Sequence, residues 1–283
     1  MIDILLISPD GMLGRAFSQL LRARGTQFDT LSYPAFDLTD PEQVARAIHD
    51  GYRLVINCAA YTAVDAAETH EAEAVAVNAA GVQLLAQRCR ASGALLVHYS
   101  TDYVFAGEVS APYRVDEPRD PQNAYGRSKA RGEELLLATG CEHLVLRTSW
   151  LYAPWGKNFV DTIARVGRER PSLRVVADQR GRPTSAQYLA QRSLALVDQR
   201  ARGIFHVTDG GECTWYEFAR AIVAGSGGSA VVEPCTSAEY PSPTRRPPYS
   251  VLDLSATDAL LGPSRPWQEN LLDVLRERAS SLA

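Results

Sequence analysis

Short runs of apolar residues, each bounded by turn-forming residues, divide the first 150 positions of the chain. Four are clear, at residues 2–8, 54–58, 95–100 and 144–149, and a weaker run covers residues 27–32. Fully apolar strands of this length are typical of a parallel sheet that helices cover on both faces. The pattern therefore predicts a buried parallel sheet in the first half of the chain.

Segments with helical periodicity alternate with these strands, and each ends just before a glycine. They are residues 12–24, 41–49 and about 66–92, followed by Gly25, Gly51 and Gly93. A glycine just past the last helical residue favours a left-handed C-terminal cap. Strands that alternate with helices through short turns predict βαβ units and a doubly wound, Rossmann-type α/β fold.

The pattern changes after residue 150, which predicts a dinucleotide-binding domain over residues 1–150 and a mainly substrate-binding lobe over residues 151–283. Prolines concentrate in residues 234–248, a composition typical of irregular surface structure. Short elements predict a smaller α/β lobe, with some segments returning to the Rossmann sheet. The expected strands are 173–177, 204–207 and 230–233, and the expected helices are 186–198, 215–224 and 267–278.

Composition narrows the class of protein. The 283 residues are 46% hydrophobic, enough for a large core, and the formal net charge is -4. No basic segment is dense enough to bind nucleic acid, and no run of about 18 apolar residues predicts a membrane span. The five cysteines are scattered without a CxxC pair and the five histidines lack metal-ligand spacing. We therefore expect a cytoplasmic monomer or homodimer with reduced thiols and no metal site.

The first predicted strand ends in a turn, "SPDGMLG", that opens a helix. Gly11 and Gly14 have the spacing of a GxxGxxG dinucleotide-binding turn, with Ser8 at the first glycine position. The helix start at Met12 and Leu13 directs backbone amides toward a bound pyrophosphate in such turns. Serine costs about 1 kcal/mol if that position needs a positive φ, and nothing otherwise. An ordinary βα turn explains the glycine pair equally well.

The second strand carries neither of the residues that usually distinguish NAD from NADP. An acid after this strand binds the ribose hydroxyls of NAD, and an arginine accommodates the extra phosphate of NADP. Here Ser32 and Tyr33 occupy that place. The cofactor expected is therefore NADPH or NADH without a choice between them. Asp37 and Leu38 follow, and either contact adenine or belong to the next helix entry, where Asp40 is a good N-cap.

Tyr125 and Lys129 lie four residues apart, on one face of a helix predicted from residue 121 to Gly140. Lys129 is one of only two lysines among 29 basic residues. A neighbouring ammonium stabilises a phenolate and lowers the pKa of a tyrosine toward the range useful for acid–base catalysis. Chance also produces such a pair, but Gly126 and Gly132 in the same helix indicate that something packs closely against it.

The fourth predicted strand ends in Ser100, Thr101 and Asp102, at the edge where open α/β sheets bind ligands. Thr101 can donate a hydrogen bond to a carbonyl oxygen while Tyr125 gives that oxygen a proton. The same three residues also commonly cap a turn.

With these motifs the chain resembles the dTDP-4-dehydrorhamnose reductase family of extended short-chain dehydrogenase/reductases. The resemblance covers nearly the whole chain in ordered stretches. They are "DGMLGR", "FDLTD", "VINCAAYTAVDAAE", "VNAAGVQLLA", "HYSTDYVFAG", "PQNAYGRSKARGE", "LRTSWLYAPWGKNF", "VVADQRGRPTSA", "GIFHVTDGGECTWYEFA" and "RRPPYSVLD". The resemblance implies NAD(P)H-dependent reduction of the 4-keto group of a dTDP-linked 6-deoxy sugar, dTDP-4-dehydrorhamnose above all.

The resemblance also implies roles for individual residues. Tyr125 would donate the proton, Lys129 would bind ribose and lower the tyrosine pKa, and Thr101 would bond the carbonyl. Further implied cofactor contacts are Gly11, Met12, Leu13, Asp37, Leu38, Ala59, Ala60 and Tyr61. Further implied substrate contacts are Asp102, Trp150, Thr184, Arg245 and Arg246, whose two guanidinium groups suit a pyrophosphate. The family usually has glycine where this chain has Ser8, and cofactor affinity is the property that this difference would affect most.

Three other functions stay open. A reductase of another dTDP-4-keto-6-deoxy sugar from a secondary-metabolite pathway would carry the same residues. A sugar-nucleotide dehydratase or epimerase shares the scaffold, but such dehydratases usually have Asp–Glu where this chain has Asp102 and Tyr103. A non-catalytic, nucleotide-binding regulatory homologue would not need Thr101, Tyr125 and Lys129 intact.

Overall fold

The computed structural model of the protein describes residues 3–282. At its centre is a six-stranded parallel sheet in the order β10-β5-β4-β3-β1-β2. The strands are β1 (Ile4–Ile7), β2 (Asp29–Leu31), β3 (Leu54–Asn57), β4 (Leu95–Thr101), β5 (His143–Thr148) and β10 (Gly203–His206). The predicted doubly wound α/β class is confirmed, and the five strands expected before residue 150 all lie within two residues of their expected bounds.

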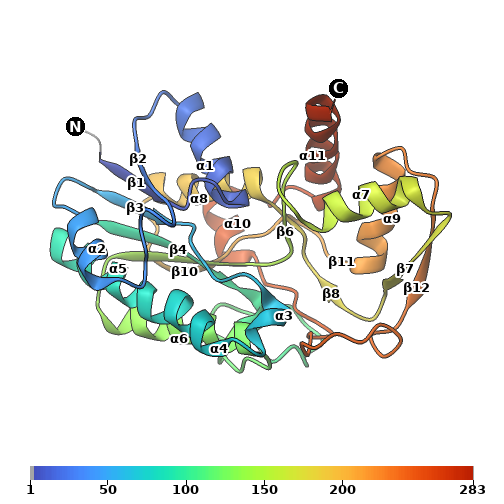
Figure 1. Cartoon of the computed structure of the whole chain (residues 1–283), viewed down its shortest axis with the longest axis horizontal. Helices are drawn as coiled ribbons and strands as arrows, with labels where there is room; N and C mark the ends of the chain where they lie inside the picture. The colour runs from blue at the N-terminus through green and yellow to red at the C-terminus, as the bar shows by residue number, and fades with distance from the viewer. Residues whose placement is uncertain (1–2, 283) are drawn as a thin grey trace.

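Helices cover both faces of this sheet (Figure 1). One face packs against α1 and α8, and the other against α2, α5 and α6. The bounds are α1 (Met12–Ala23), α2 (Pro41–Ala47), α5 (Val82–Ser92), α6 (Ala124–Ala138) and α8 (Ala186–Asp198). Consecutive strand residues point to opposite faces, so Leu6 joins the hydrophobic cluster under α1 while Leu5 joins the cluster under α5. Burial on both faces explains why these strands are mainly apolar, although β4 also buries His98, Ser100 and Thr101.

The predicted helix ends are confirmed at two of three glycines. Gly25, with φ of 65°, follows α1 after one residue, and Gly93, with φ of 73°, follows α5 directly. The prediction is wrong at Gly51, because α2 already ends at Ala47 and the next residue is extended. The start of α2 is as expected, since the side chain of Asp40 accepts hydrogen bonds from two backbone N–H groups of the first turn.

The single helix expected over residues 66–92 is wrong, because the segment is divided. It contains α3 (Val64–Ala67), α4 (Glu71–Val75), the π-helical turn η1 (Ala76–Gly81) and α5. The hydroxyl of Thr69 donates to the carbonyl of Ala66 and competes with helix continuation, and the backbone of His70 is not helical. π-helical turns are frequent at functional sites, and this one carries Asn78, whose side chain reaches α6.

The C-terminal part of the chain builds a second, smaller hydrophobic core. β7 pairs in parallel with β12, and α7, α9 and α11 contribute to the same core. The bounds are β7 (Ser172–Val176), β12 (Val231–Cys235), α7 (Phe159–Glu169), α9 (Trp215–Gly225) and α11 (Trp267–Leu282). Shorter elements are β6 (Leu151–Tyr152), β8 (Arg180–Gly181), β9 (Thr184–Ser185), β11 (Cys213–Thr214) and α10 (Ser255–Leu261).

Two elements that follow residue 150 belong to the Rossmann part of the structure. β10 pairs with β5 at the edge of the six-stranded sheet, and α8 packs against α1. The division of binding roles between residues 1–150 and 151–283 stays a prediction. Over residues 3–282, no helix is both long enough and apolar enough to cross a membrane.

The close packing predicted for α6 is confirmed. A Cβ atom added at Gly132 would lie 2.0 Å from the backbone oxygen of Asn78, in η1. One added at Gly126 would lie 2.2 Å from the backbone oxygen of Tyr103, in the 3-10 turn η2 (Asp102–Val104). Only glycine permits these approaches, so α6 rests directly on the backbone that follows β4. This contact fixes Tyr125 relative to Thr101.

Candidate active site

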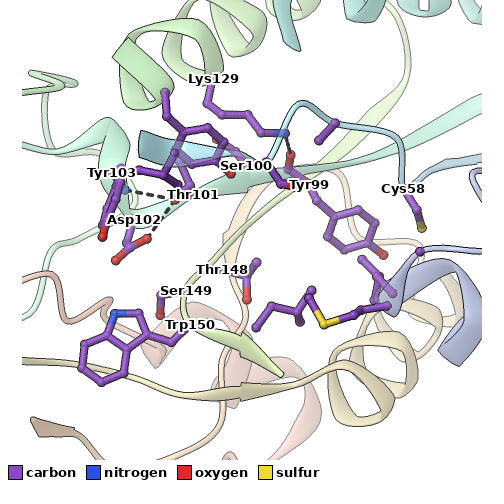
Figure 2. A pocket seen from close by; sticks show the side chains of 18 of the residues that line it. Cys58, Tyr99, Ser100, Thr101, Asp102, Tyr103, Lys129, Thr148, Ser149 and Trp150 are labelled. Carbon is purple, nitrogen blue, oxygen red and sulfur yellow. Dashed lines mark hydrogen bonds between the residues drawn. The ribbon is translucent and has the colours of Figure 1, made fainter. Parts of the chain in front are cut away.

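A cavity of about 400 Å³ lies at the carboxyl ends of β1, β3, β4 and β5 (Figure 2). We call it the central cavity. The chain winds outward in opposite directions from β1 and β3, and ligands of open α/β sheets bind at such a switch point. The lining includes nine of the residues predicted to act here: Gly11, Met12, Leu13, Ala60, Thr101, Asp102, Tyr125, Lys129 and Trp150.

The glycine turn leaves the start of α1 open toward the central cavity. Gly11 is the N-cap, and no side chain caps the helix there. A Cβ atom at Gly11 would meet only atoms of Ser8, at 3.7 and 3.8 Å, whereas one at Gly14 would lie 1.9 Å from the backbone oxygen of Ser8. Gly14 thus packs the helix on the turn. The uncapped first amides of α1 fit a pyrophosphate, because a helix N-terminus favours anions.

Ser8 occupies the left-handed region, with φ of 61°. Its backbone N–H donates to the carbonyl of Leu31 at 2.7 Å, which holds the turn against the end of β2. The position therefore does require a positive φ, and the serine carries the steric cost that a glycine would avoid.

Replacing Ser8 by glycine is expected to raise the free energy of unfolding by up to about 1 kcal/mol, because glycine has no Cβ clash at positive φ. Arg200→Gly is the matched control, since Arg200 has φ of 57° on the surface. Urea unfolding of both variants measures the effect. A less stable Ser8→Gly protein beside a stabilised Arg200→Gly protein would contradict the prediction.

Tyr125 and Lys129 project from the first two turns of α6. The helix begins at Ala124 rather than near residue 121, because the side chain of Asn123 caps it by accepting from the Gly126 N–H at 2.7 Å. The Lys129 Nζ donates to the backbone oxygen of Tyr99 at 2.9 Å (Figure 2). Both side chains line the central cavity.

The pKa values of this pair move in directions that the sequence did not predict. Burial, followed by the charge of Asp102, raises the pKa of Tyr125, and a hydrogen bond from Thr101 opposes this shift. Burial lowers the pKa of Lys129 to about 8, against the opposing charge of Glu133. The expected lowering of the Tyr125 pKa by Lys129 is therefore wrong here, because desolvation dominates. The phenol stays protonated at neutral pH, as a proton donor must be.

Thr101 and Asp102 form a hydrogen-bonded unit at the end of β4. The Thr101 Oγ1 donates to Asp102 Oδ1 at 2.8 Å and accepts from the Tyr103 N–H at 3.2 Å. Among the described residues, Asp102 Oδ2 has no hydrogen-bond partner although it is buried, and burial raises the pKa of Asp102 to about 6. A buried acceptor without a donor is costly, so this oxygen suits a ligand hydroxyl. Donation from Thr101 to a ligand oxygen requires rotation of its hydroxyl.

A smaller cavity of about 210 Å³ adjoins the central one beside β2, and we call it the β2-side cavity. It shares Ser8 and Ala60 with the central cavity. The predicted residues Asp37, Leu38 and Ala59 line it. The lining of both cavities lacks the predicted Tyr61, whose backbone N–H and carbonyl instead bond the side chain of Asn78.

The predicted substrate residues are only partly brought together. Trp150, with φ of 46°, stacks on Trp215 at a ring separation of 3.6 Å in the wall of the central cavity. Thr184 is buried in β9, where it accepts a hydrogen bond from Thr148, and it lies outside the lining of this cavity. The structure thus keeps Trp150 and Asp102 in the cavity lining and leaves Thr184 outside it, where the Thr184 N–H donates to the Trp150 carbonyl at 3.2 Å.

The two arginines diverge instead of forming one anion site. Arg245 pairs with Glu108 at 2.8 Å, whereas Arg246 pairs with Asp65 at 3.1 Å. Arg246 lines a third cavity of about 470 Å³, which we call the lobe cavity and which shares Trp215 with the central cavity.

Several cavity residues were missed by the sequence analysis. Among them are Cys58, Tyr99, Thr148, Ser149 and Trp215. The rule that ligands bind at the carboxyl ends of strands would have found all but Trp215, because the others lie in or just after β3, β4 and β5. Trp215 comes from α9, which only the folded chain brings to this place.

Asn78 was also missed, and it connects the cavity wall to α6. Its Nδ2 donates to the carbonyl of Tyr61 at 3.0 Å and to the hydroxyl of Ser128 at 2.9 Å, and its Oδ1 accepts from the Tyr61 N–H. The π-helical turn directs this side chain, and no sequence pattern indicated that turn.

In this structure a parallel Rossmann sheet brings a glycine turn, a threonine and a Tyr–Lys pair to one cavity. This combination defines the short-chain dehydrogenase/reductase class. The family model described as "RmlD substrate binding domain" matches residues 2–280. The dTDP-4-dehydrorhamnose reductase of Burkholderia thailandensis is 40% identical over 286 residues, covering 94% of this chain and 96% of that protein. The chain belongs to the dTDP-4-dehydrorhamnose reductase family.

Two further comparisons agree with this membership. A probable dTDP-4,6-dihydroxy-2-methyloxan-3-one 4-ketoreductase of Streptomyces antibioticus is 40% identical over 275 residues, covering 94% of this chain and 92% of that protein. The crystal structure of dTDP-4-dehydrorhamnose reductase from Bacillus anthracis, in complex with NADP, matches with a TM-score of 0.93 at 32% identity. The match covers 97% of this chain and 99% of that one.

Proposed function

We propose that this protein reduces the 4-keto group of a dTDP-linked 6-deoxy sugar with a reduced nicotinamide dinucleotide, and that dTDP-4-dehydrorhamnose is the substrate. The observation that carries this proposal is the meeting of Thr101, Tyr125 and Lys129 at one cavity with the uncapped start of α1. The names of the relatives support the choice of substrate. The NADP in the Bacillus anthracis enzyme supports the choice of cofactor.

The residues that would hold the cofactor follow from their positions. The amides at Gly11, Met12 and Leu13 would bind the pyrophosphate, and Lys129 would bond the ribose beside the nicotinamide. The β2-side cavity would take the adenosine, with Asp37 and Leu38 in its wall. When bound, the dinucleotide supplies the hydride that reduces the sugar carbonyl.

The chain's own residues would donate the proton and stabilise the developing charge. Tyr125 donates its phenolic proton to the C4 oxygen as that oxygen gains negative charge. Thr101 bonds the same oxygen, and Asp102 Oδ2 accepts from a sugar hydroxyl. Holding the reacting groups in contact supplies much of the rate.

The lobe cavity supports a substrate with a nucleotide attached. It shares the lining residue Trp215 with the central cavity, and Arg174 and Arg246 also line it. Phe159 and Tyr240 add aromatic surface. Guanidinium groups pair well with phosphates, and aromatic rings stack on a base. A free sugar would need neither feature.

A second candidate is a reductase of a different dTDP-4-keto-6-deoxy sugar, as the name of the Streptomyces antibioticus relative suggests. The same three residues would carry that reaction, so substrate identity is the distinguishing property. We also infer a cytoplasmic location, in keeping with five free cysteines. A monomeric or homodimeric state stays a prediction.

The decisive experiment mixes the purified protein with dTDP-4-dehydrorhamnose and either NADPH or NADH. We expect the absorbance of the reduced nicotinamide to fall and NMR to identify dTDP-rhamnose as the product. Turnover only with other dTDP-4-keto sugars would favour the second candidate. Dinucleotide binding without turnover on any keto sugar would contradict the proposed function.

A further inference from the structure

Residues 236–248, which we call the strap, follow β12 and form neither a helix nor a strand. Two hydroxyl groups attach the strap to α3. The hydroxyl of Thr244 donates to the carbonyl of Val64 at 3.4 Å, and that of Ser242 donates to Asp65 Oδ1 at 3.2 Å. Val64 also lines the central cavity. The strap therefore connects the smaller lobe to the wall of the central cavity.

Arg246 of the strap lies between the central cavity and the lobe cavity. It lines the lobe cavity, and its Nη2 donates to both carboxylate oxygens of Asp65, at 3.1 and 3.3 Å. Its charge also acts on Tyr103, which lines the central cavity. Burial and then the charge of Asp102 raise the pKa of Tyr103, and the charge of Arg246 opposes this shift. The Arg246–Asp65 pair thus lies where a bound nucleotide sugar would extend from one cavity to the other.

The Arg246–Asp65 pair is one that a stronger anion can replace. The two side chains are 31% and 49% exposed, and water screens an ion pair at such positions, so the pair contributes little to stability. A diphosphate carries more negative charge than one carboxylate, and it binds a guanidinium group with two parallel hydrogen bonds. Asp65 and a diphosphate would therefore compete for the same group.

We propose that Asp65 competes with the substrate diphosphate for Arg246, an inference that rests on the proposed function. In the free protein Asp65 neutralises the guanidinium group, and a nucleoside diphosphate displaces this carboxylate when it binds. The exchange weakens the binding of any diphosphate ligand, because the ion pair must first be broken. A ligand without phosphate leaves the pair intact and is unaffected. Asp65 thereby favours release of the product, which carries the same diphosphate as the substrate.

Calorimetric titration of the full chain with dTDP and with thymidine tests this competition without turnover. Asp65→Asn retains an oxygen that can accept from Arg246 and Ser242 and removes only the negative charge. We expect this variant to bind dTDP about fivefold more tightly than the native protein, because an exposed ion pair no longer opposes binding. Its affinity for thymidine should change less than about twofold, since thymidine has no phosphate.

The adjacent arginine supplies the matched control. Arg245 Nη2 donates to Glu108 Oε1 at 2.8 Å, and neither residue lines the central cavity or the lobe cavity. Glu108→Gln therefore frees a neighbouring guanidinium group and changes the net charge equally. This control variant should keep an affinity for dTDP within about twofold of the native value.

A double-variant cycle separates competition for Arg246 from simple repulsion between Asp65 and the ligand. In an Arg246→Gln background, Asp65→Asn should change dTDP affinity less than about twofold, because no guanidinium group remains to compete for. A fivefold gain in that background would overturn the inference, and so would an equal gain with Glu108→Gln or with thymidine.

The Asp65→Asn variant alone also decides between the inference and the proposed function. Native or weaker dTDP binding by this variant, with normal turnover of the dTDP-linked sugar by the native protein, would overturn the inference alone. Absence of dTDP binding in the native protein and in every variant would overturn the proposed function as well.

Discussion

Replacing Tyr125 by phenylalanine is expected to lower kcat about a thousandfold, because general acid catalysis by a positioned side chain contributes about 10²–10⁴. The variant retains the ring that lines the central cavity and loses only the hydroxyl that gives its proton to the C4 oxygen. Dinucleotide affinity should stay within about threefold of the native value. Steady-state kinetics on dTDP-4-dehydrorhamnose and calorimetric titration with the dinucleotide measure the two quantities.

Tyr52→Phe is the matched control for this substitution. Burial raises the pKa of Tyr52 to about 12, and its hydroxyl donates to Asp29 at 2.7 Å. Neither residue lines the central cavity. Removing that hydroxyl costs a hydrogen bond of about 1 kcal/mol in stability and should leave kcat unchanged. If the Tyr125→Phe variant kept more than a tenth of native kcat and native dinucleotide affinity, Tyr125 would be excluded as the proton donor.

The sheet and the position of the cavity followed from local patterns. Apolar runs identified the strands, because a strand buried on both faces is mostly apolar. Thr101 was recognised from its place at the end of such a run, and Tyr125 with Lys129 from a helical spacing. These inferences need only the chain direction and the rule that the carboxyl ends of parallel strands meet at one edge.

Other features depend on contacts between distant segments, which a local pattern does not contain. The π-helical turn η1, which carries Asn78, packs closely against Gly132, 54 residues further along the chain. A Cβ atom added at Gly132 would lie only 2.0 Å from the backbone oxygen of Asn78. Arg245 and Arg246 are adjacent in sequence, but partners on different segments draw them apart. The Tyr125 pKa was misjudged because spacing reveals a neighbouring charge and not the depth of burial.

Replacing Lys129 by methionine is expected to make the protein more stable and much less active. Burial lowers the pKa of Lys129 from 10.5 to about 8, so at neutral pH the buried ammonium lowers the free energy of unfolding by about 3 kcal/mol. Methionine removes that cost but leaves the Tyr99 carbonyl without its donor, at about 1 kcal/mol. The net gain in free energy of unfolding is about 2 kcal/mol, while loss of the ribose contact should lower kcat/KM about a hundredfold.

The pH dependence gives this prediction its sign. Between about pH 8 and pH 10.5 the unfolded chain still binds the Lys129 proton that the folded chain has released, so native stability rises relative to the variant over this window. Urea unfolding of both proteins at several pH values should therefore show the variant's advantage below pH 8 and its decline toward pH 10.5. Lys157→Met is the control, since Lys157 is the other lysine and is exposed, and it should match native stability and activity. A variant advantage that stays constant with pH would mean that Lys129 is not a desolvated ammonium in the folded protein.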